Sequence, residues 1–209
     1  MNSNFANEAA YDQWAPLYPP QPHNALMQAE QDALLSLWPE LRGARALDLA
    51  SGTGRYGLLL QERGAAFVVG SDLSRQMLER SPLPLRVRAD MMKLPFATAS
   101  FDVIVSGLAV GHAPQLQGWM DEMARVLAPG GCLLFSDFHP DAARAGMTRS
   151  FTDGDQRKHI LAHRVYELAD HRAAAAASGL QLEDWREARV KKETGPAVVL
   201  AMRLRKLAA

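Results

Sequence analysis

The chain has 209 residues, the size of one ordinary domain with a full core, which leaves no room for a second independent fold. Lysine plus arginine equal aspartate plus glutamate at 23 each, so no overall field favours nucleic acid or an anionic membrane. The N-terminal residues have neither a basic start nor a long apolar stretch, and no later segment approaches the roughly twenty apolar residues that a membrane span needs. Cys132 predicts a buried thiol in a reducing compartment. We therefore expect a cytoplasmic monomer or homodimer with small-molecule partners, and neither nucleic acid nor a membrane among them.

The N-terminal part predicts a helix after a cluster of prolines. Prolines 19, 20 and 22 stiffen the turn into this helix, which begins near His23 or Asn24. His23 would cap the helix or face the active site.

Seven apolar segments then predict strands, and helical patterns separate most of them. The predicted strands cover residues 44–50, 66–72, 85–90, 101–107, 131–137, 180–190 and 197–205. The predicted helices cover residues 57–64, 74–81, 113–131 and 167–179. This alternation indicates a doubly wound α/β fold whose seven-stranded sheet is mostly parallel and covered on both faces. The last two strands follow each other directly, which predicts a hairpin and one antiparallel strand near the C-terminus.

The stretch "ALDLASGTGRYGLLL", residues 46–60, has the pattern of strand, tight turn and helix. The apolar segment ends on Asp48, and Gly52 and Gly54 follow. Glycines let the backbone approach a ligand, and the next helix offers unpaired N–H groups. Because ligands bind at this edge of an open parallel sheet, we expect a binding site here. An ordinary turn with Asp48 as a cap is the alternative.

Two more predicted strands end on carboxylates at the same edge. Asp72 comes about twenty residues after the turn, where a carboxylate accepts two hydrogen bonds from a ribose diol. Asp90 precedes Met91, a pair suited to an adenine amino group and ring. The turn lacks the lysine of a triphosphate-binding loop. Each carboxylate alone could be a helix cap, but together they predict an adenosine compound without a demanding phosphate tail, or a dinucleotide.

Four segments carry a family resemblance: "LDLASGTGRYG", "GSDLS", "ADMMKLPFATASFDVIVSGLAVGH" and "EMARVLAPGGCLLFSDF". Together they resemble class I S-adenosylmethionine-dependent methyltransferases, especially the group of ubiquinone and menaquinone C-methyltransferases and malonyl-carrier-protein O-methyltransferases. The resemblance implies a Rossmann-like fold, S-adenosyl-L-methionine as cofactor, and in-line methyl transfer to an O, N, S or C nucleophile of a small molecule. Ala50 and Ser51 depart from the family's glycine and frequent cysteine, so the turn should be slightly more constrained.

The resemblance also assigns parts of the cofactor to parts of the chain. The loop after the first strand contacts the methionine part, the acidic residue after the second binds the ribose, and the aspartate after the third meets the adenine. Arg55 would pair with the methionine carboxylate. Carried onto this sequence, the cofactor-binding residues are Asp48, Ala50, Ser51, Gly52, Gly54, Arg55, Asp72, Leu73, Asp90, Met91, Ser106 and Leu108.

Two histidines are candidate catalytic residues. The sulfonium already activates the methyl group, so a base is needed only if the acceptor must lose a proton. His112 and His139 follow the fourth and fifth strands at the ligand-binding edge, so either could be a base or orient the substrate. A loop histidine without a catalytic role is the alternative. His159 and His163 have no clear third ligand nearby, so we expect no metal site.

The substrate side is predicted from the N-terminus and from residues 141–165. Members of the family often carry a Y-D-x-x-A-x-x-Y segment that folds over the cofactor, which implies an aromatic lid; an apolar contact of the N-terminal arm with the core is the alternative. The predicted substrate-binding residues are Tyr11, Trp14, Tyr18, His23 and Arg149. We expect one methyltransferase domain, 1–209, divided into an N-terminal lid and helix (1–42), a cofactor-binding core (43–140), a substrate-side cover (141–165) and a final helix with the C-terminal strands (166–209).

Three other functions stay open at this point. The chain could be a non-catalytic regulatory protein that binds S-adenosylmethionine, or a methyltransferase acting on RNA or protein. The balanced charge argues against RNA. A nicotinamide dehydrogenase is the third, since the glycine turn partly resembles a dinucleotide-binding turn.

Overall fold

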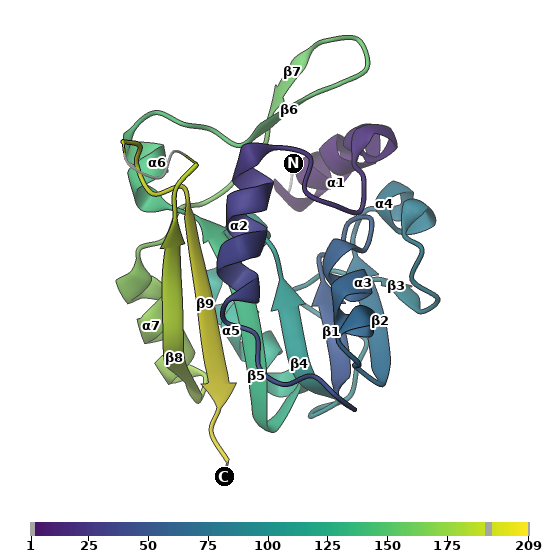
Figure 1. Cartoon of the computed structure of the whole chain (residues 1–209), viewed down its shortest axis with the longest axis vertical. Coiled ribbons are helices and arrows are strands. Elements are labelled where there is room, and N and C mark those ends of the chain that lie inside the picture. Colours follow the sequence, from purple (N-terminus) through teal and green to yellow (C-terminus); the bar gives the residue numbers. More distant parts are fainter. Residues whose placement is uncertain (1–2, 191–193, 209) are drawn as a thin grey trace.

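A computed structural model describes residues 3–190 and 194–208 of the chain. A twisted central sheet carries helices on both faces, and a small two-stranded arm projects beyond one end (Figure 1). The seven strands of the sheet are β1 (Arg45–Leu49), β2 (Phe67–Asp72), β3 (Arg86–Arg88), β4 (Phe101–Ser106), β5 (Leu127–Phe138), β8 (Leu180–Ala188) and β9 (Val199–Lys206).

The order of the strands is β3-β2-β1-β4-β5-β9-β8. The pairs from β3 through β5 are parallel, and β9 runs antiparallel to both of its neighbours. The predicted doubly wound fold with one antiparallel strand is therefore confirmed. The strand order reverses direction between β1 and β4, and the crevice at such a switch point is where open α/β sheets bind ligands.

The helices are α1 (Ser3–Trp14), α2 (Ala25–Leu35), α3 (Arg55–Glu62), α4 (Arg75–Arg80), α5 (Leu116–Val126), α6 (Pro140–Arg144) and α7 (Leu168–Ala177), with short 3-10 turns η1 (Ala15–Leu17) and η2 (Val110–His112). None of the helices within the described ranges has the length and apolar character needed to cross a membrane. Asn24, rather than His23, caps α2, because its Oδ1 accepts the Met27 N–H at 2.9 Å.

The core lies in two layers, one on each face of the sheet. Leu47, Ile104 and Leu133 face the layer that contains α5 and α7. Ala46 and Val103, their neighbours along β1 and β4, face the layer that contains α2 and α3. This alternation is what a strand buried on both faces requires, and it fixes the direction in which each strand end points.

The sequence pattern did not predict two elements that border the site. One is helix α1, and the other is the arm formed by β6 (Ser150–Thr152) and β7 (Lys158–Ile160). Both strands of the arm have three residues, too few for an alternating pattern to stand out. The arm lies within the segment predicted as the substrate-side cover.

Candidate functional site

A pocket opens at the carboxyl ends of β1, β2 and β4, and residues of α1 line it. Helix α1 lies at this end of the sheet (Figure 1). The predicted residues that line the pocket are Tyr11, Tyr18, Asp48, Ala50, Ser51, Gly52, Arg55, Asp72, Leu73, Asp90, Met91, Leu108, His112 and Arg149. Sequence positions far apart therefore meet at the predicted sheet edge. Five other predicted residues do not line it: Trp14, His23, Gly54, Ser106 and His139.

The loop after β1 is a tight turn held by buried groups. Ala50, Gly52 and Gly54 have left-handed φ angles of 52°, 54° and 91°. A Cβ on Gly54 would lie 2.5 Å from the Ser81 Oγ. A glycine is therefore needed at position 54 for close packing beneath the pocket. Asp48 Oδ2 accepts the Gly57 N–H at 2.7 Å and fixes the start of α3. Burial of this carboxyl raises its pKa to about 7.

Asp72 stands at the end of β2 with both oxygens turned to backbone donors. Its Oδ2 accepts the Gly52 N–H at 2.7 Å, and its Oδ1 accepts the Ser74 N–H at 2.8 Å. Burial raises its pKa to about 6 against the opposing effect of these hydrogen bonds. Because a carboxylate oxygen accepts more than one hydrogen bond, the geometry leaves capacity for a ribose diol.

Other polar groups of the pocket also fit an adenosine compound. The hydroxyls of Ser51 and Ser71 are buried at the pocket wall with no hydrogen-bond partner among the described residues. Buried hydroxyls of this kind are usually satisfied, so a polar ligand can complete them. Asp90 Oδ1 accepts the Met92 N–H at 2.9 Å, which fixes its carboxylate beside Met91. These carboxylate acceptors and hydroxyls suit a ribose diol and an adenine amino group.

Arg55 lines the pocket but already has an ionic partner. Its Nη2 lies 2.7 Å from Glu30 Oε2, and both side chains are buried. Glu30 Oε1 accepts further hydrogen bonds from the Tyr56 hydroxyl at 2.7 Å and the Ser136 hydroxyl at 2.6 Å. Nothing in the sequence predicts the role of Glu30, whose only signal is a charged residue within an otherwise apolar helix face. Pairing of Arg55 with a ligand carboxylate stays a prediction.

His112 is held between α1 and the segment after β7. Its Nδ1 lies 2.9 Å from the Ala162 carbonyl, so we assign the ring proton to Nδ1. Its Nε2 then accepts the Tyr11 hydroxyl at 2.9 Å and lies 3.4 Å from Arg149 Nη1. Burial and, secondarily, the Arg149 charge lower its pKa to about 3. His112 is thus neutral near pH 7 and a weak base.

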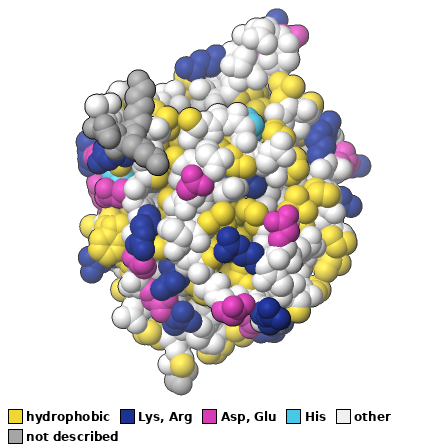
Figure 2. All heavy atoms as spheres, in the orientation of Figure 1, with side chains coloured by type: hydrophobic (Ala, Val, Ile, Leu, Met, Phe, Trp, Pro, Cys, Tyr) yellow, Lys and Arg dark blue, Asp and Glu magenta, His cyan; other side chains and the backbone are white. Residues whose placement is uncertain are grey.

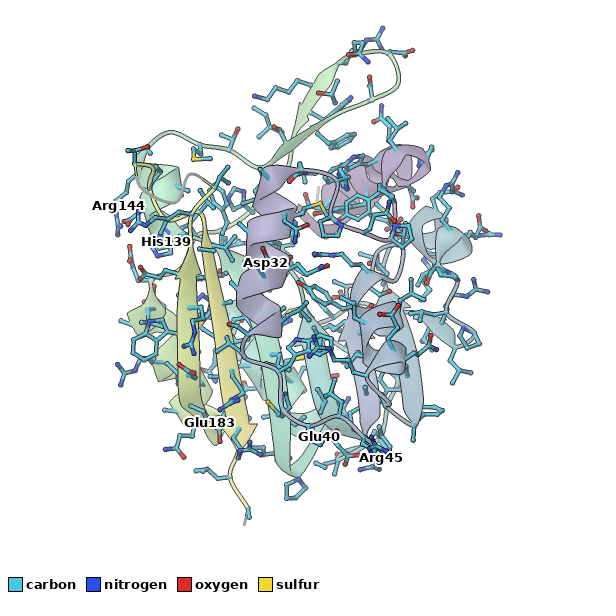
Figure 3. The ribbon with its side chains drawn as sticks, in the orientation of Figure 1. Asp32, Glu40, Arg45, His139, Arg144 and Glu183 are labelled. Carbon is cyan, nitrogen blue, oxygen red and sulfur yellow. The ribbon has the colours of Figure 1, made fainter. Side chains whose placement is uncertain are left out.

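His139 lies at the end of β5 but serves the neighbouring helix. Its Nδ1 accepts the Asp141 N–H at 3.1 Å and caps α6, and its Nε2 lies 3.5 Å from Glu187. Figure 3 shows it beside Arg144, at α6. The structure therefore does not bring His139 to the pocket. Ser106 is fully buried at the end of β4 and also stays outside the lining.

The aromatic N-terminal segment divides between pocket and core. Tyr11 and Tyr18 line the pocket, whereas Trp14 stacks on Phe151 with ring centroids 4.7 Å apart. His23 is exposed and touches the edges of the Trp14 and Tyr18 rings. The apolar contact of the N-terminal segment is thus present through Trp14, and Tyr11 and Tyr18 lie where a lid would act. The lid itself stays a prediction.

α1 is also anchored by a carboxylate. Asp12 Oδ1 accepts the Ser74 hydroxyl at 2.5 Å and the Gln76 N–H at 3.1 Å, which joins α1 to the start of α4.

Across residues 3–190 and 194–208, no group of three or more His, Cys, Asp or Glu side chains could hold a metal ion.

Comparison with known proteins gives matches that include several named methyltransferases. The family model described as "Methyltransferase domain" matches residues 47–135. A malonyl-[acyl-carrier protein] O-methyltransferase of Enterobacter lignolyticus is 37% identical over 179 residues, which are 84% of this chain and 68% of that protein. A demethylmenaquinone methyltransferase of Thermus thermophilus is 38% identical over 105 residues, 46% of this chain and 48% of the relative.

The solved structures agree with these relatives. The crystal structure of an S-adenosylmethionine-dependent methyltransferase from Mesorhizobium loti matches with 26% identity and a TM-score of 0.71, over 85% of this chain and 97% of the other. A Burkholderia thailandensis 1,6-didemethyltoxoflavin-N1-methyltransferase with bound S-adenosylhomocysteine has the same fold, with 21% identity and a TM-score of 0.64, over 98% and 86% of the two chains. Several of the curated relatives match over about half their length or less.

Proposed function

Because the chain belongs to the S-adenosylmethionine-dependent methyltransferases, we propose that its pocket holds this cofactor through Asp72, Asp90 and the loop after β1. The observation that carries the proposal is that carboxylates from three strand ends, Asp48, Asp72 and Asp90, line one pocket. Bound there, the cofactor supplies a methyl group already activated by its sulfonium. The protein must then hold an acceptor in line with that group and exclude water.

We further propose that the acceptor is a small molecule that is methylated on a carboxylate oxygen. Arg149 lines the pocket, and among the described side chains no carboxylate lies within 4 Å of its guanidinium. Its Nη1 donates to the Leu108 carbonyl beside His112. An arginine without an acidic partner in a pocket favours an anionic ligand.

The surroundings of His112 support the same acceptor class. Its Nε2 is occupied by the Tyr11 hydroxyl, so the ring is not free to take a proton from an acceptor. A carboxylate oxygen needs no base: it forms its new bond to the methyl carbon as the carbon–sulfur bond breaks. The first relative is by its name an O-methyltransferase, which agrees with an oxygen acceptor.

The test compares a carboxylate acceptor with neutral analogues. We would incubate the protein with the cofactor and a small dicarboxylic monothioester, or its alcohol and amide analogues, and detect methyl esters by mass spectrometry. Arg149→Gln should raise the KM for the carboxylate at least tenfold, because a charged contact in the pocket is lost, and leave the Kd of S-adenosylhomocysteine nearly unchanged.

Arg144→Gln is the matched control. Arg144 belongs to the same segment but is exposed and pairs with Asp141 and Glu167 near α6, outside the pocket lining (Figure 3). Its replacement should leave the KM unchanged. Equal methylation of neutral acceptors, insensitive to Arg149→Gln, would overturn the carboxylate proposal and leave the cofactor site standing.

We also propose that the protein acts in the cytoplasm as a monomer or homodimer, without nucleic acid or membrane partners, and keep the division into residues 1–42, 43–140, 141–165 and 166–209. Basic and acidic side chains are interspersed over the face in Figure 2, which supports small-molecule partners. Cys132 is buried, and burial raises its thiol pKa to about 12, which is consistent with a reducing compartment.

A further inference from the structure

Glu30 is a fully buried carboxylate of α2 that lies behind the pocket rather than in its lining. It receives Arg55 Nη2 at 2.7 Å, the Tyr56 hydroxyl at 2.7 Å and the Ser136 hydroxyl at 2.6 Å. Three donors and no acceptor surround it, and one of the donors is the charged guanidinium of Arg55. Glu30 and Arg55 therefore form a buried ion pair, in which Glu30 supplies the negative charge.

This charge lies directly behind the wall of the pocket. Gly107 lines the pocket, and a Cβ built on it would lie 2.6 Å from the Tyr56 ring, 3.1 Å from Glu30 Oε1 and 3.3 Å from Arg55 Nη2. The backbone after β4 thus packs against the Glu30–Arg55–Tyr56 group without room for a side chain between them. A ligand at this end of the pocket experiences both charges of the ion pair.

Within the ion pair, Glu30 balances the charge of Arg55 at this end of the pocket. Among the described residues, Glu30 supplies the one carboxylate within 4 Å of the Arg55 guanidinium. Without Glu30, the pocket would present an unbalanced cation in a poorly solvated place. S-adenosylmethionine carries one positive charge more than its thioether product, S-adenosylhomocysteine, and an unbalanced cation would penalise the cofactor more than the product.

We propose that Glu30 is a positioning residue that balances the charge of Arg55 and so sets the preference of the pocket between the cationic cofactor and the neutral product. The inference rests on the proposed cofactor site. It predicts that the ratio Kd(S-adenosylmethionine)/Kd(S-adenosylhomocysteine), rather than either affinity alone, depends on the charge at position 30.

Calorimetric titration of Glu30→Gln with both ligands tests this. The ratio should rise about tenfold, the order expected for unit charges about 10 Å apart at an effective dielectric constant of about 20. General damage to the pocket would weaken both ligands by the same factor and leave the ratio unchanged. Glu30→Asp keeps the charge and should restore the ratio even if both affinities fall.

Two further variants complete the test. Gln31→Ala removes a neutral partner of the same guanidinium, 3.3 Å from Arg55 Nη1, and should leave the ratio unchanged. Arg55→Met leaves Glu30 unbalanced in the opposite sense, so the ratio should fall below that of the unmodified protein. This variant also decides the matter if Glu30→Gln does not fold.

The failures of the two proposals are distinguishable. If the unmodified protein binds neither ligand, the cofactor site itself is wrong. If it binds both, and the charge-changing variants leave the ratio where it was, only the role of Glu30 is overturned.

Discussion

At the scale of single residues, the buried carboxyl of Asp48 creates a testable pH dependence. Its pKa, raised to about 7 by burial, lies above the ordinary value of 3.8, so its contribution to stability is present at low pH and lost as pH rises through about 7. The side chain introduced by Asp48→Asn cannot ionise, so this variant does not lose stability in that way. The free energy of unfolding of the variant minus that of the unmodified protein should therefore rise by about 2 kcal/mol between about pH 5.5 and pH 7.5. Urea unfolding at both pH values measures this difference.

Asp102→Asn is the control for that series. Asp102 is paired with Arg45, and this hydrogen bond lowers its pKa, so it is ionised in both states across the same window. Its effect on stability should not change with pH. A constant difference for Asp48→Asn would show that Asp48 is already ionised in the folded protein.

At the scale of elements, α1 depends on the β6–β7 arm. Trp14 stacks on Phe151, and Gln13 Nε2 donates to Asp153 Oδ2 at 3.1 Å. Phe151→Ala removes a buried aromatic worth about 3 kcal/mol, so α1 should exchange its backbone amides faster while β1 and β4 remain protected. Ile160→Ala, at a 67% exposed position of the same arm, is the control. Unchanged exchange in α1 after Phe151→Ala would mean that α1 is held without the arm.

At the scale of the whole molecule, ligand binding should stabilise one cooperative unit. S-adenosylhomocysteine at a hundredfold its Kd adds about 2.7 kcal/mol to the free energy of unfolding, which raises the Tm by roughly 5 to 10 °C. NAD should leave the Tm unchanged, because the family's cofactor is an adenosine compound without a pyrophosphate. Scanning calorimetry with each ligand measures these Tm values. A rise in Tm with NAD alone would favour the dehydrogenase alternative.

The parts of the molecule that the sequence predicts well are those fixed by local pattern and topology together. Asp72 and Asp90 each follow an apolar run, and parallel strands bring such ends to one edge whatever the details of packing. The position of His139 does not follow from topology in the same way, because a residue after β5 can turn either into the pocket or onto the next helix. His139 turns onto α6 because its Nδ1 caps that helix. The spacing of residues in the sequence does not predict this contact.

The contacts of Glu30 could not be predicted from the sequence for a related reason. Its partners Arg55, Tyr56 and Ser136 come from three other parts of the chain, and the packing of α2 against the sheet brings them together. A single sequence shows the charged residue but not its partners. The β6–β7 arm was missed because its strands are short, and its contact with α1 through Phe151 and Trp14 joins distant parts of the chain.

The position of β9 has a consequence for synthesis. β9 is inserted between β5 and β8, so residues 199–206 hydrogen-bond to strands that leave the ribosome before them on both sides. Until they emerge, the edge of β5 is an unpaired strand edge, and such edges recruit other chains. Strands β1 to β4, which carry the pocket, can pair early, but the sheet is complete only after β9 has been synthesised. During translation the edge of β5 is therefore exposed at a stage when the strands of the ligand-binding half have already been synthesised.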